Sequence, residues 1–591
     1  MTSLRSAGCV ALAVLVTLGG CADAERMDGD RISRPGEYEG YSEPVYDGYE
    51  MSSFYVEVRD GTRLAVDLFR PTLDGVVTEE PLPVVWMHTP YNRRTYRGGL
   101  AAERYPGFAL RLVPYGYNVA VVDFRGLFAS FGRNVGYNRG EWVDPARWDS
   151  YDVTEWFAEQ PWSTGAVGMW GCSATGGSQM QTLTTRPPSL RAVVPMSAEF
   201  DAYPFSVMGG VARLERFSDP PSTSRQANAA RDARAVPVDG PEAEALLEAA
   251  IAEHVDNIES VGQVPFRNSV SPTAGVPWWE LSSPSTYLDE LAEPGIGVLS
   301  VANWDEAGTG HGPFFTFNNV DPDYGKLLVG PATHCAWSAV RDETGFDLVT
   351  EELRFFDYWL KDVENGVMDE PAVTCFTYNA PEGSEWRTSE VWPLASETRT
   401  PYYLAGDRLV TEAPSDPSRQ PAPIGVASAE STPVTFEVGT DGVSYETEPL
   451  PQAMEVTGHP SMDLWIETGA GDVDVTALLE DVAPDGSTRS YQMIGRLRAS
   501  HRALGRPPYD DLDLPWRSHT EESVAPVPDG EPVRLEFEIL PMSYVFPAGH
   551  RVRLTLTFAD PLARGRDDLG VAVLAGAETP SAVILPVIPT R

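Results

Sequence analysis

Short, continuous runs of apolar residues recur along the first two thirds of the chain, bounded by glycine, proline or asparagine. The runs are residues 84–87, 119–122, 166–170, 192–194, 296–301 and 327–329. Runs of this kind are typical of parallel strands that are buried on both faces. Amphipathic stretches that suit helices lie between them, for example residues 151–159 and 351–361. The alternation predicts a doubly wound α/β sheet.

Three other sequence patterns interrupt or flank this alternation of strands and helices. Residues 54–60 and 64–69 alternate around Asp60-Gly61 and predict a β-hairpin. Arg-rich and Ala/Glu-rich sequence at 205–294 predicts a helical cap inserted over one edge of the sheet. From about residue 371, alternating runs between Pro, Gly and Asp turns predict an all-β jelly roll or sandwich.

These sequence patterns predict the following domain organisation: a leader at 1–21, a linker at 22–44, an α/β domain in two parts at 45–204 and 295–370, the cap at 205–294, and a jelly-roll β domain at 371–591.

Composition narrows the possible partners. A chain of 591 residues is too long for one core. The formal charge of −42 argues against a nucleic-acid partner and against binding to an anionic membrane by charge. The sequence has no metal-ligand cluster and no phosphate-binding glycine motif, so we expect no cofactor. Composition does not set an oligomeric state.

The N-terminus has the form of an export signal. Residues 4–21 contain a basic residue, an apolar stretch too short to span a bilayer, and small residues before Cys21. Leu18-Gly19-Gly20-Cys21 resembles a bacterial lipobox, which implies that Cys21 receives lipid after cleavage. An ordinary signal peptide with an incidental cysteine is the alternative. We therefore expect an exported, membrane-anchored lipoprotein on the periplasmic or extracellular face.

Ser173 is the candidate nucleophile. It follows the apolar run at 166–170 and precedes a helical run at 178–185, which is the context of a nucleophile elbow. The spacing departs from Gly-x-Ser-x-Gly, because Thr175 holds the second position after the serine. A serine hydroxyl needs an imidazole to take its proton and a carboxylate to orient that imidazole.

Asp305 and His334 are the candidate partners, since each follows a predicted strand and the order Ser, Asp, His is that of α/β-hydrolases. Asp305 could instead be a helix N-cap, and the adjacent Glu306 is a rival orienting acid. Of the other histidines in this domain, we expect His88 to hydrogen-bond at the end of an early strand and His311 to line the entrance.

At these residues the chain resembles the cocaine esterase and X-prolyl dipeptidyl peptidase group of serine hydrolases, along roughly residues 50–590. Motifs occur in the family's order at 59–67, 89–91, 123–130, the elbow, 304–305, 330–334 and 545–551. The resemblance implies an α/β-hydrolase fold with an inserted cap and a C-terminal jelly roll.

The resemblance also implies roles for single residues. The triad would be Ser173, Asp305 and His334, and the oxyanion hole would use the Tyr91 hydroxyl and the backbone N–H of Ala174. The family usually has tyrosine where this chain has Ala174, so we expect an altered pocket there.

Two cysteines flank the candidate triad. Cys172 precedes Ser173 and Cys335 follows His334, a pattern that resembles tannases and fungal feruloyl esterases, in which these cysteines are bonded. The resemblance implies a Cys172–Cys335 disulfide. Two free buried thiols are the alternative.

These observations favour a serine hydrolase that cleaves carboxylic esters through an acyl-enzyme. In the relatives that act on α-amino acyl groups, extra carboxylates beside the catalytic aspartate hold the substrate ammonium. Beside Asp305 this chain offers only Glu306, so the resemblance favours a small-molecule ester with a hydrophobic or aromatic acyl group over a short peptide. Cap residues that could hold this group are Trp278, Trp279, Phe205 and Met208. The alternatives are an X-Pro dipeptidyl-peptidase, an amidase or acylase, and, in another class, an inert carbohydrate-binding lipoprotein.

Overall fold

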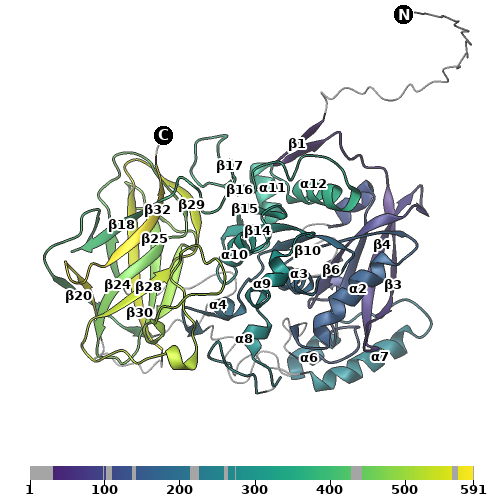
Figure 1. Cartoon of the computed structure of the whole chain (residues 1–591), viewed down its shortest axis with the longest axis horizontal. Coiled ribbons are helices and arrows are strands. Elements are labelled where there is room, and N and C mark those ends of the chain that lie inside the picture. The colour runs from purple at the N-terminus through teal and green to yellow at the C-terminus, as the bar shows by residue number, and fades with distance from the viewer. Residues whose placement is uncertain are drawn as a thin grey trace, which may run out of the picture.

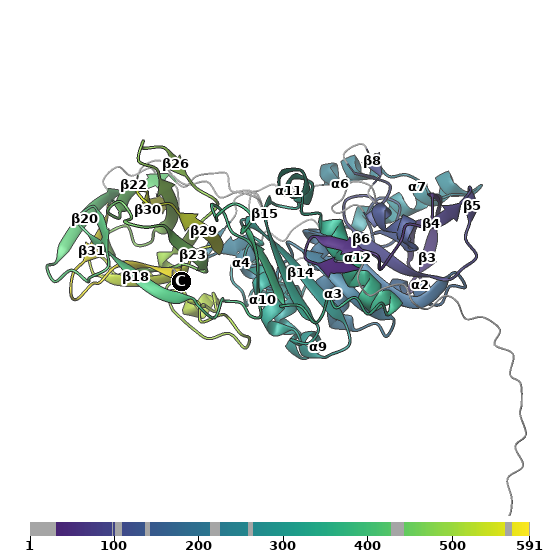
Figure 2. The same ribbon diagram turned by 90° about the horizontal axis from the view of Figure 1, so that it is seen from above.

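The computed structural model has two lobes, an α/β lobe with its cap and an all-β lobe (Figures 1 and 2). It describes the chain except residues 1–30, 97–98, 101–108, 136–141, 213–224, 258–263, 273, 427–441, 562–569 and 590–591. The predicted leader and Cys21 therefore lie outside the described residues. Within the described part, no helix is both long and apolar enough to cross a membrane.

The central sheet of the α/β lobe has the order β17-β16-β15-β14-β11-β10-β6-β9-β4-β3. Its strands are β3 (Gly48–Glu57), β4 (Arg63–Leu73), β6 (Leu82–Thr89), β9 (Asn118–Asp123), β10 (Ser163–Cys172), β11 (Leu190–Met196), β14 (Gly297–Asp305), β15 (Gly325–Thr333), β16 (Val373–Phe376) and β17 (Trp386–Ser389). Seven neighbouring strands run parallel, namely β16, β15, β14, β11, β10, β6 and β9. The hairpin β3–β4 adds an antiparallel edge on one side of the sheet, and β17 adds one on the other side. Every residue of β6 and β9 is buried, which explains their continuous apolar sequence.

Helices cover both faces of this sheet. One face packs against α2 (Asp149–Ala158) and α3 (Ala174–Thr185). The other packs against α12 (Leu348–Lys361), with Phe355 and Phe356 in the core. A Cβ at Gly168 would lie 2.9 Å from the ring of Phe356, so the close approach of α12 to β10 requires glycine there. The doubly wound α/β fold is confirmed.

The inserted segment contains helices α4 (Ala202–Ser206), α6 (Arg225–Asp232), α7 (Ala243–Glu253), α8 (Trp278–Leu281) and α9 (Leu288–Ala292), with two short strands, β12 (Val207–Met208) and β13 (Val211–Ala212). Helices α6, α7 and α8 lie along the lower side of the molecule in Figure 1, and α4 lies beside the all-β lobe. Helices α10 (Gly312–Asn319) and α11 (Trp337–Thr344) follow β14 and β15.

The all-β lobe has one large hydrophobic core of its own. Its main strands are β18 (Thr398–Ala405), β20 (Ser418–Pro423), β22 (Gly442–Glu446), β23 (Met454–Gly458), β24 (Ser461–Thr468), β25 (Asp474–Val482), β27 (Ile494–Arg498), β28 (Val533–Glu538), β29 (Met542–Phe546), β30 (Arg551–Asp560), β31 (Gly570–Ala575) and β32 (Ala582–Ile588). Alternating burial along β24 and β30 matches the period-2 sequence pattern.

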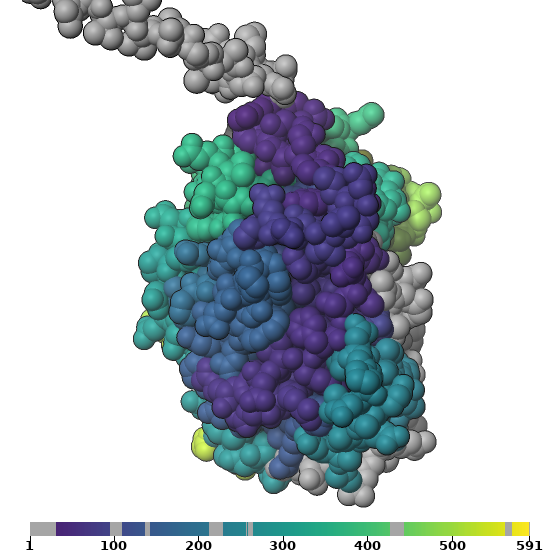
Figure 3. Space-filling model, turned by 90° about the vertical axis from the view of Figure 1, so that its right-hand side faces the viewer, coloured from purple at the N-terminus to yellow at the C-terminus, as the bar shows by residue number. Residues whose placement is uncertain are grey.

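The structure differs from the predicted boundaries at two places. Residues 31–44, predicted as linker, include the hairpin of β1 (Ile32–Arg34) and β2 (Glu37–Glu39), which is fixed to α12. There the Gly36 N–H donates to Glu351 Oε1 at 2.6 Å and the Tyr38 hydroxyl donates to Asp357 Oδ2 at 2.9 Å. Figure 3 shows the purple N-terminal residues on the face of the α/β lobe that is on the right in Figure 1.

The second boundary concerns residues 371–389, predicted as part of the β domain. Strand β16 pairs in parallel with β15, with Val329 opposite Cys375, and β17 pairs with β16. Both strands therefore extend the α/β sheet, and the all-β lobe begins with β18. A short strand at a sheet edge has the same alternating sequence in either domain, so the pattern alone did not separate them.

Candidate active site

Ser173 lies in a sharp turn between β10 and α3. Its backbone has φ 62° and ψ −127°, a conformation that costs free energy for a residue with a side chain. Surrounding contacts hold it. The Ser173 N–H donates to the Met196 carbonyl at 2.9 Å, and the Thr175 hydroxyl contacts both N and O of Cys172 at 2.8 Å. A Cβ at Gly171 would lie 2.4 Å from Thr175 Oγ1, so only glycine fits this turn. The serine is partly exposed, as an attacking group must be.

His334 follows β15 and is hydrogen-bonded to a carboxylate. Its Nδ1 lies 2.9 Å from Glu306 Oε2 and 3.2 Å from Oε1. Because Nδ1 faces this carboxylate, Nε2 is the nitrogen left for proton exchange with a nucleophile. The structure thus gives His334 the orientation that a general base requires.

Glu306 is the buried acid of this pair and follows β14. Its carboxylate also accepts hydrogen bonds from Ser197 Oγ at 2.5 Å, Thr309 Oγ1 at 2.6 Å and Asn303 Nδ2 at 3.0 Å. Burial alone would raise the pKa of Glu306, but the attraction of His334 and these hydrogen bonds bring it below its ordinary value. Glu306 is therefore held as an anion beside the imidazole. The three supporting residues have no signal in the sequence, because nothing but proximity in the fold relates Ser197 to Glu306.

The orienting role predicted for Asp305 is wrong. Asp305 is the last residue of β14, and its Oδ2 accepts a hydrogen bond from the Tyr378 hydroxyl at 3.2 Å. Successive side chains at a strand end point in opposite directions, so Asp305 and Glu306 cannot both face His334. Burial raises the pKa of Asp305 to about 6. The rival acid of the sequence analysis, Glu306, is the one that contacts the histidine.

Cys172 and Cys335 are joined by a disulfide in the structure, with Cα atoms 6.0 Å apart across 163 residues of sequence. The bond ties the residue before Ser173 to the residue after His334. Among the described residues, the one cluster of three residues of metal-ligand type is Cys172, His334 and Cys335, and the disulfide already uses both sulfur atoms.

Tyr91 and Ala174 lie at the same carboxyl edge of the sheet. Tyr91 follows β6, its N–H donates to Thr89 Oγ1 at 3.0 Å, and its ring packs against the core that contains Cys172. Ala174 is the first residue of α3, where a backbone N–H has no partner within the helix and the helix dipole is positive.

The other two histidines of this domain have no place in the triad. His88 is fully buried, and burial lowers its pKa to about 3. Among the described residues, neither of its ring nitrogens has a hydrogen-bond partner. The hydrogen bond predicted for it is therefore wrong, and its ring instead packs edge-on against Phe124. His311 stacks on His459 of the all-β lobe, with the two Nδ1 atoms 3.3 Å apart.

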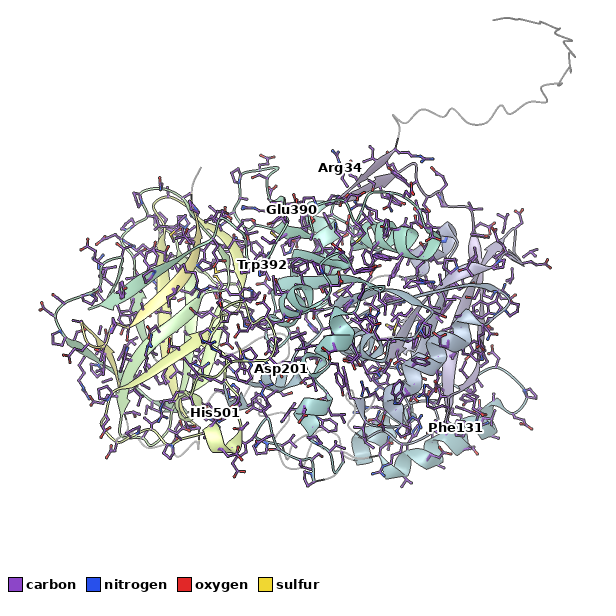
Figure 4. All side chains as sticks on the ribbon, in the orientation of Figure 1. Arg34, Phe131, Asp201, Glu390, Trp392 and His501 are labelled. Carbon is purple, nitrogen blue, oxygen red and sulfur yellow. A yellow bond between two sulfur atoms is a disulfide. The ribbon has the colours of Figure 1, made fainter. Side chains whose placement is uncertain are left out.

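A cavity of about 70 Å³, here called the junction cavity, lies where the α/β domain, the cap and the all-β lobe meet. Its walls come from residues 199–209 after β11, Arg267, residues 307–315 after β14, residues 509–519, and Glu538. In Figure 4, Asp201 is labelled between the two lobes and His501 on the all-β lobe. Met208 lines this cavity, whereas Trp278 and Trp279 pack in a separate cluster around Tyr203. That these residues hold the acyl group stays a prediction.

Comparison with known proteins gives consistent matches. Residues 60–336 match the model of the X-Pro dipeptidyl-peptidase (S15 family), and residues 365–567 match the X-Pro dipeptidyl-peptidase C-terminal non-catalytic domain. A Mycobacterium bovis protein named as a serine esterase is 30% identical over 607 residues, covering 90% of this chain and 94% of the relative. The cocaine esterase of a Rhodococcus species is 28% identical over 611 residues, covering 91% and 98%.

Solved structures show the same fold. A CocE/NonD family hydrolase from Staphylococcus aureus superposes with a TM-score of 0.69 at 21% identity, covering 92% of this chain and 97% of that one. An α-amino acid ester hydrolase superposes with a TM-score of 0.68 at 18% identity, covering 95% and 99%.

Proposed function

Because the chain belongs to the cocaine esterase and X-Pro dipeptidyl-peptidase (S15) family of serine hydrolases, we propose that it cleaves carboxylic esters through an acyl-enzyme on Ser173. The observation that supports this most is the buried Glu306 carboxylate bonded to His334 Nδ1, on the sheet edge that holds the strained Ser173 turn.

The proposed reaction has two half-reactions. His334 Nε2 takes the proton of Ser173 Oγ as the oxygen attacks the ester carbonyl, and the Glu306 carboxylate stabilises the imidazolium that forms. The C–O bond to the leaving alcohol breaks, and His334 returns the proton to that alcohol. Water then attacks the acyl-enzyme with His334 again as base, which releases the acid and restores Ser173.

The tetrahedral intermediates need donors for their oxyanion. We assign this role to the Ala174 N–H and the Tyr91 hydroxyl, as the family resemblance implies. The position of Ala174 at the positive end of α3 and of Tyr91 at the end of β6 supports the assignment. One such donor contributes about 2.7 to 4 kcal/mol to transition-state binding.

An ester substrate fits the described carboxylates better than a peptide with a free amino terminus. Glu306 is occupied by His334 and three further hydrogen bonds, and Asp305 is bonded to Tyr378. Neither is free to hold a substrate ammonium beside the triad. The second candidate, an X-Pro dipeptidyl-peptidase or a related amidase or acylase, is favoured by the name of the matching family model.

The test compares p-nitrophenyl acyl esters with Gly-Pro-p-nitroanilide, using the wild type and Ser173→Ala. The proposal expects ester turnover that the variant loses. Preferential cleavage of the anilide would favour the peptidase instead. If neither substrate is cleaved, the remaining candidates are an acylase and the inert carbohydrate-binding lipoprotein.

We further propose that the protein is exported and anchored by lipid on Cys21, in support of which the sequence has Leu18-Gly19-Gly20-Cys21 after an apolar stretch. Mass spectrometry of the N-terminal peptide tests this. A diacylglyceryl group on Cys21, absent from Cys21→Ser, is expected, and an unmodified Cys21 peptide would contradict the anchor.

A further inference from the structure

Arg517 is a buried cation with open hydrogen-bond donors. Arg517 is 4% exposed and lines the junction cavity. Nη1 donates to the Pro515 carbonyl at 3.3 Å, whereas Nε and Nη2 have no hydrogen-bond partner among the described residues. Burying a guanidinium with open donors costs free energy unless another group satisfies them. A ligand in the cavity with matching acceptor atoms would satisfy them.

The two open atoms define the shape of that ligand. Nε and Nη2 lie on the same edge of the planar guanidinium and form a fork that matches the two oxygens of a carboxylate. Glu538 lines the same cavity and attracts Arg517, but within the described residues no acidic side chain comes within 4.0 Å of this guanidinium. Arg517 thus lines the cavity without a protein carboxylate at salt-bridge distance.

Besides Arg517, the cavity wall has one other arginine, Arg267, and four acidic residues. Arg267 pairs with Asp201, so these two charges offset each other. Burial raises the pKa of Glu538 and of Asp511, which makes both easier to protonate than ordinary carboxyls. Glu199 is the fourth acidic residue of the wall.

The rest of the wall suits an apolar body attached to the carboxylate. Phe200, Phe315, Tyr509, Leu514 and Trp516 contribute aromatic and aliphatic surface. A ligand that combines this body with one carboxylate would satisfy both the fork and the apolar wall.

The cavity adjoins the candidate active site through one loop. Ala307 and Gly308 line the cavity and directly follow Glu306, and the next residue, Thr309, donates to the Glu306 carboxylate. We propose that the junction cavity binds an organic carboxylate through the Nε/Nη2 edge of Arg517. Resting on the proposed function, we assign this carboxylate to the ester substrate, on the part remote from the scissile bond.

The first experiment compares p-nitrophenyl hemiglutarate with p-nitrophenyl pentanoate, which differ by a carboxylate in place of a methyl group. The ratio of their kcat/KM values is measured for the wild type, Arg517→Gln and Arg517→Lys. We expect Arg517→Gln to lower the ratio by roughly 10- to 100-fold, as for loss of a charged hydrogen-bonded pair, and Arg517→Lys to fall between. Arg506→Gln, an exposed arginine of the same loop region, should leave the ratio unchanged.

The second experiment separates a substrate carboxylate from a free acid and does not depend on catalysis. Glutarate should raise the melting temperature of the wild type and not that of Arg517→Gln. A glutarate shift without a preference between the two esters would support the carboxylate site but assign it to a free acid. If neither ester is cleaved, the proposed function fails while the glutarate shift still reports on the site.

The proposal is overturned if glutarate shifts neither protein and the ester ratio is the same in both. It is also overturned if Arg517→Gln and Glu538→Gln each destabilise the protein and the double variant adds nothing, because Arg517 would then serve only as the partner of Glu538.

Discussion

Replacing Glu306 by glutamine tests the assignment of the orienting acid. The change keeps the size of the side chain, but the negative charge beside His334 Nδ1 is lost. Ser197 and Thr309 donate to different oxygens of Glu306, and the amide keeps only one acceptor oxygen, so one of these two hydrogen bonds is lost as well. In the structure that nitrogen lies 2.9 and 3.2 Å from the two carboxylate oxygens, so no other anion shares the role among the described residues. Loss of the orienting carboxylate in a serine triad lowers kcat by roughly 10⁴-fold.

The matched control is Asp305→Asn, the same chemical change one residue earlier. Asp305 is bonded to Tyr378 and not to His334, so we expect kcat to change by less than about 10-fold, or about 1.4 kcal/mol. The assay is steady-state hydrolysis of p-nitrophenyl butyrate at pH 8 for both variants and the wild type. Equal losses in the two variants, or a larger loss in Asp305→Asn, would refute the assignment of Glu306.

Three further predictions concern stability and the oxyanion. Burial raises the pKa of Asp305 to about 6, so the folded state loses stability as the pH rises from the pKa of an aspartate in the unfolded chain toward 6. Calorimetry should therefore show Asp305→Asn to be more stable than the wild type by about 1 to 3 kcal/mol at pH 8, with little gain at pH 4. An equal gain at both pH values would contradict this. Replacing Cys172 and Cys335 by alanine should cost about 5 kcal/mol for a 163-residue separation, measured by chaotrope unfolding, and an unchanged midpoint would disprove the constraint. Tyr91→Phe should lower kcat by roughly 10²- to 10³-fold with little change in KM; an effect on KM alone would assign Tyr91 to substrate binding.

Much of the fold follows from the sequence because the buried parallel strands have continuous apolar runs. The runs at 84–87 and 119–122 both lie in strands whose every residue is buried, so their pattern has one interpretation. The hairpin at 31–39 was missed because its contacts to α12 are made by single polar groups of distant residues. Strand pattern also did not locate the start of the all-β lobe, since β16 pairs with the α/β sheet.

The candidate site was predicted in part for the same reason. Ser173 and His334 each follow a strand, and the sheet brings such positions to one edge. Choosing between Asp305 and Glu306 required knowing where β14 ends, because one residue reverses the direction of the side chain. Arg517 gave no sequence signal, since its open donors appear only once three parts of the fold enclose it.

The most direct test of the account is the site of covalent labelling by a fluorophosphonate, which traps the nucleophile of a serine hydrolase at its reactive oxygen. The account predicts one phosphonyl adduct on the peptide that contains Ser173, formed in step with loss of ester turnover, absent from Ser173→Ala and slow in Glu306→Gln. An adduct on another residue, or ester turnover that persists in Ser173→Ala, would contradict it.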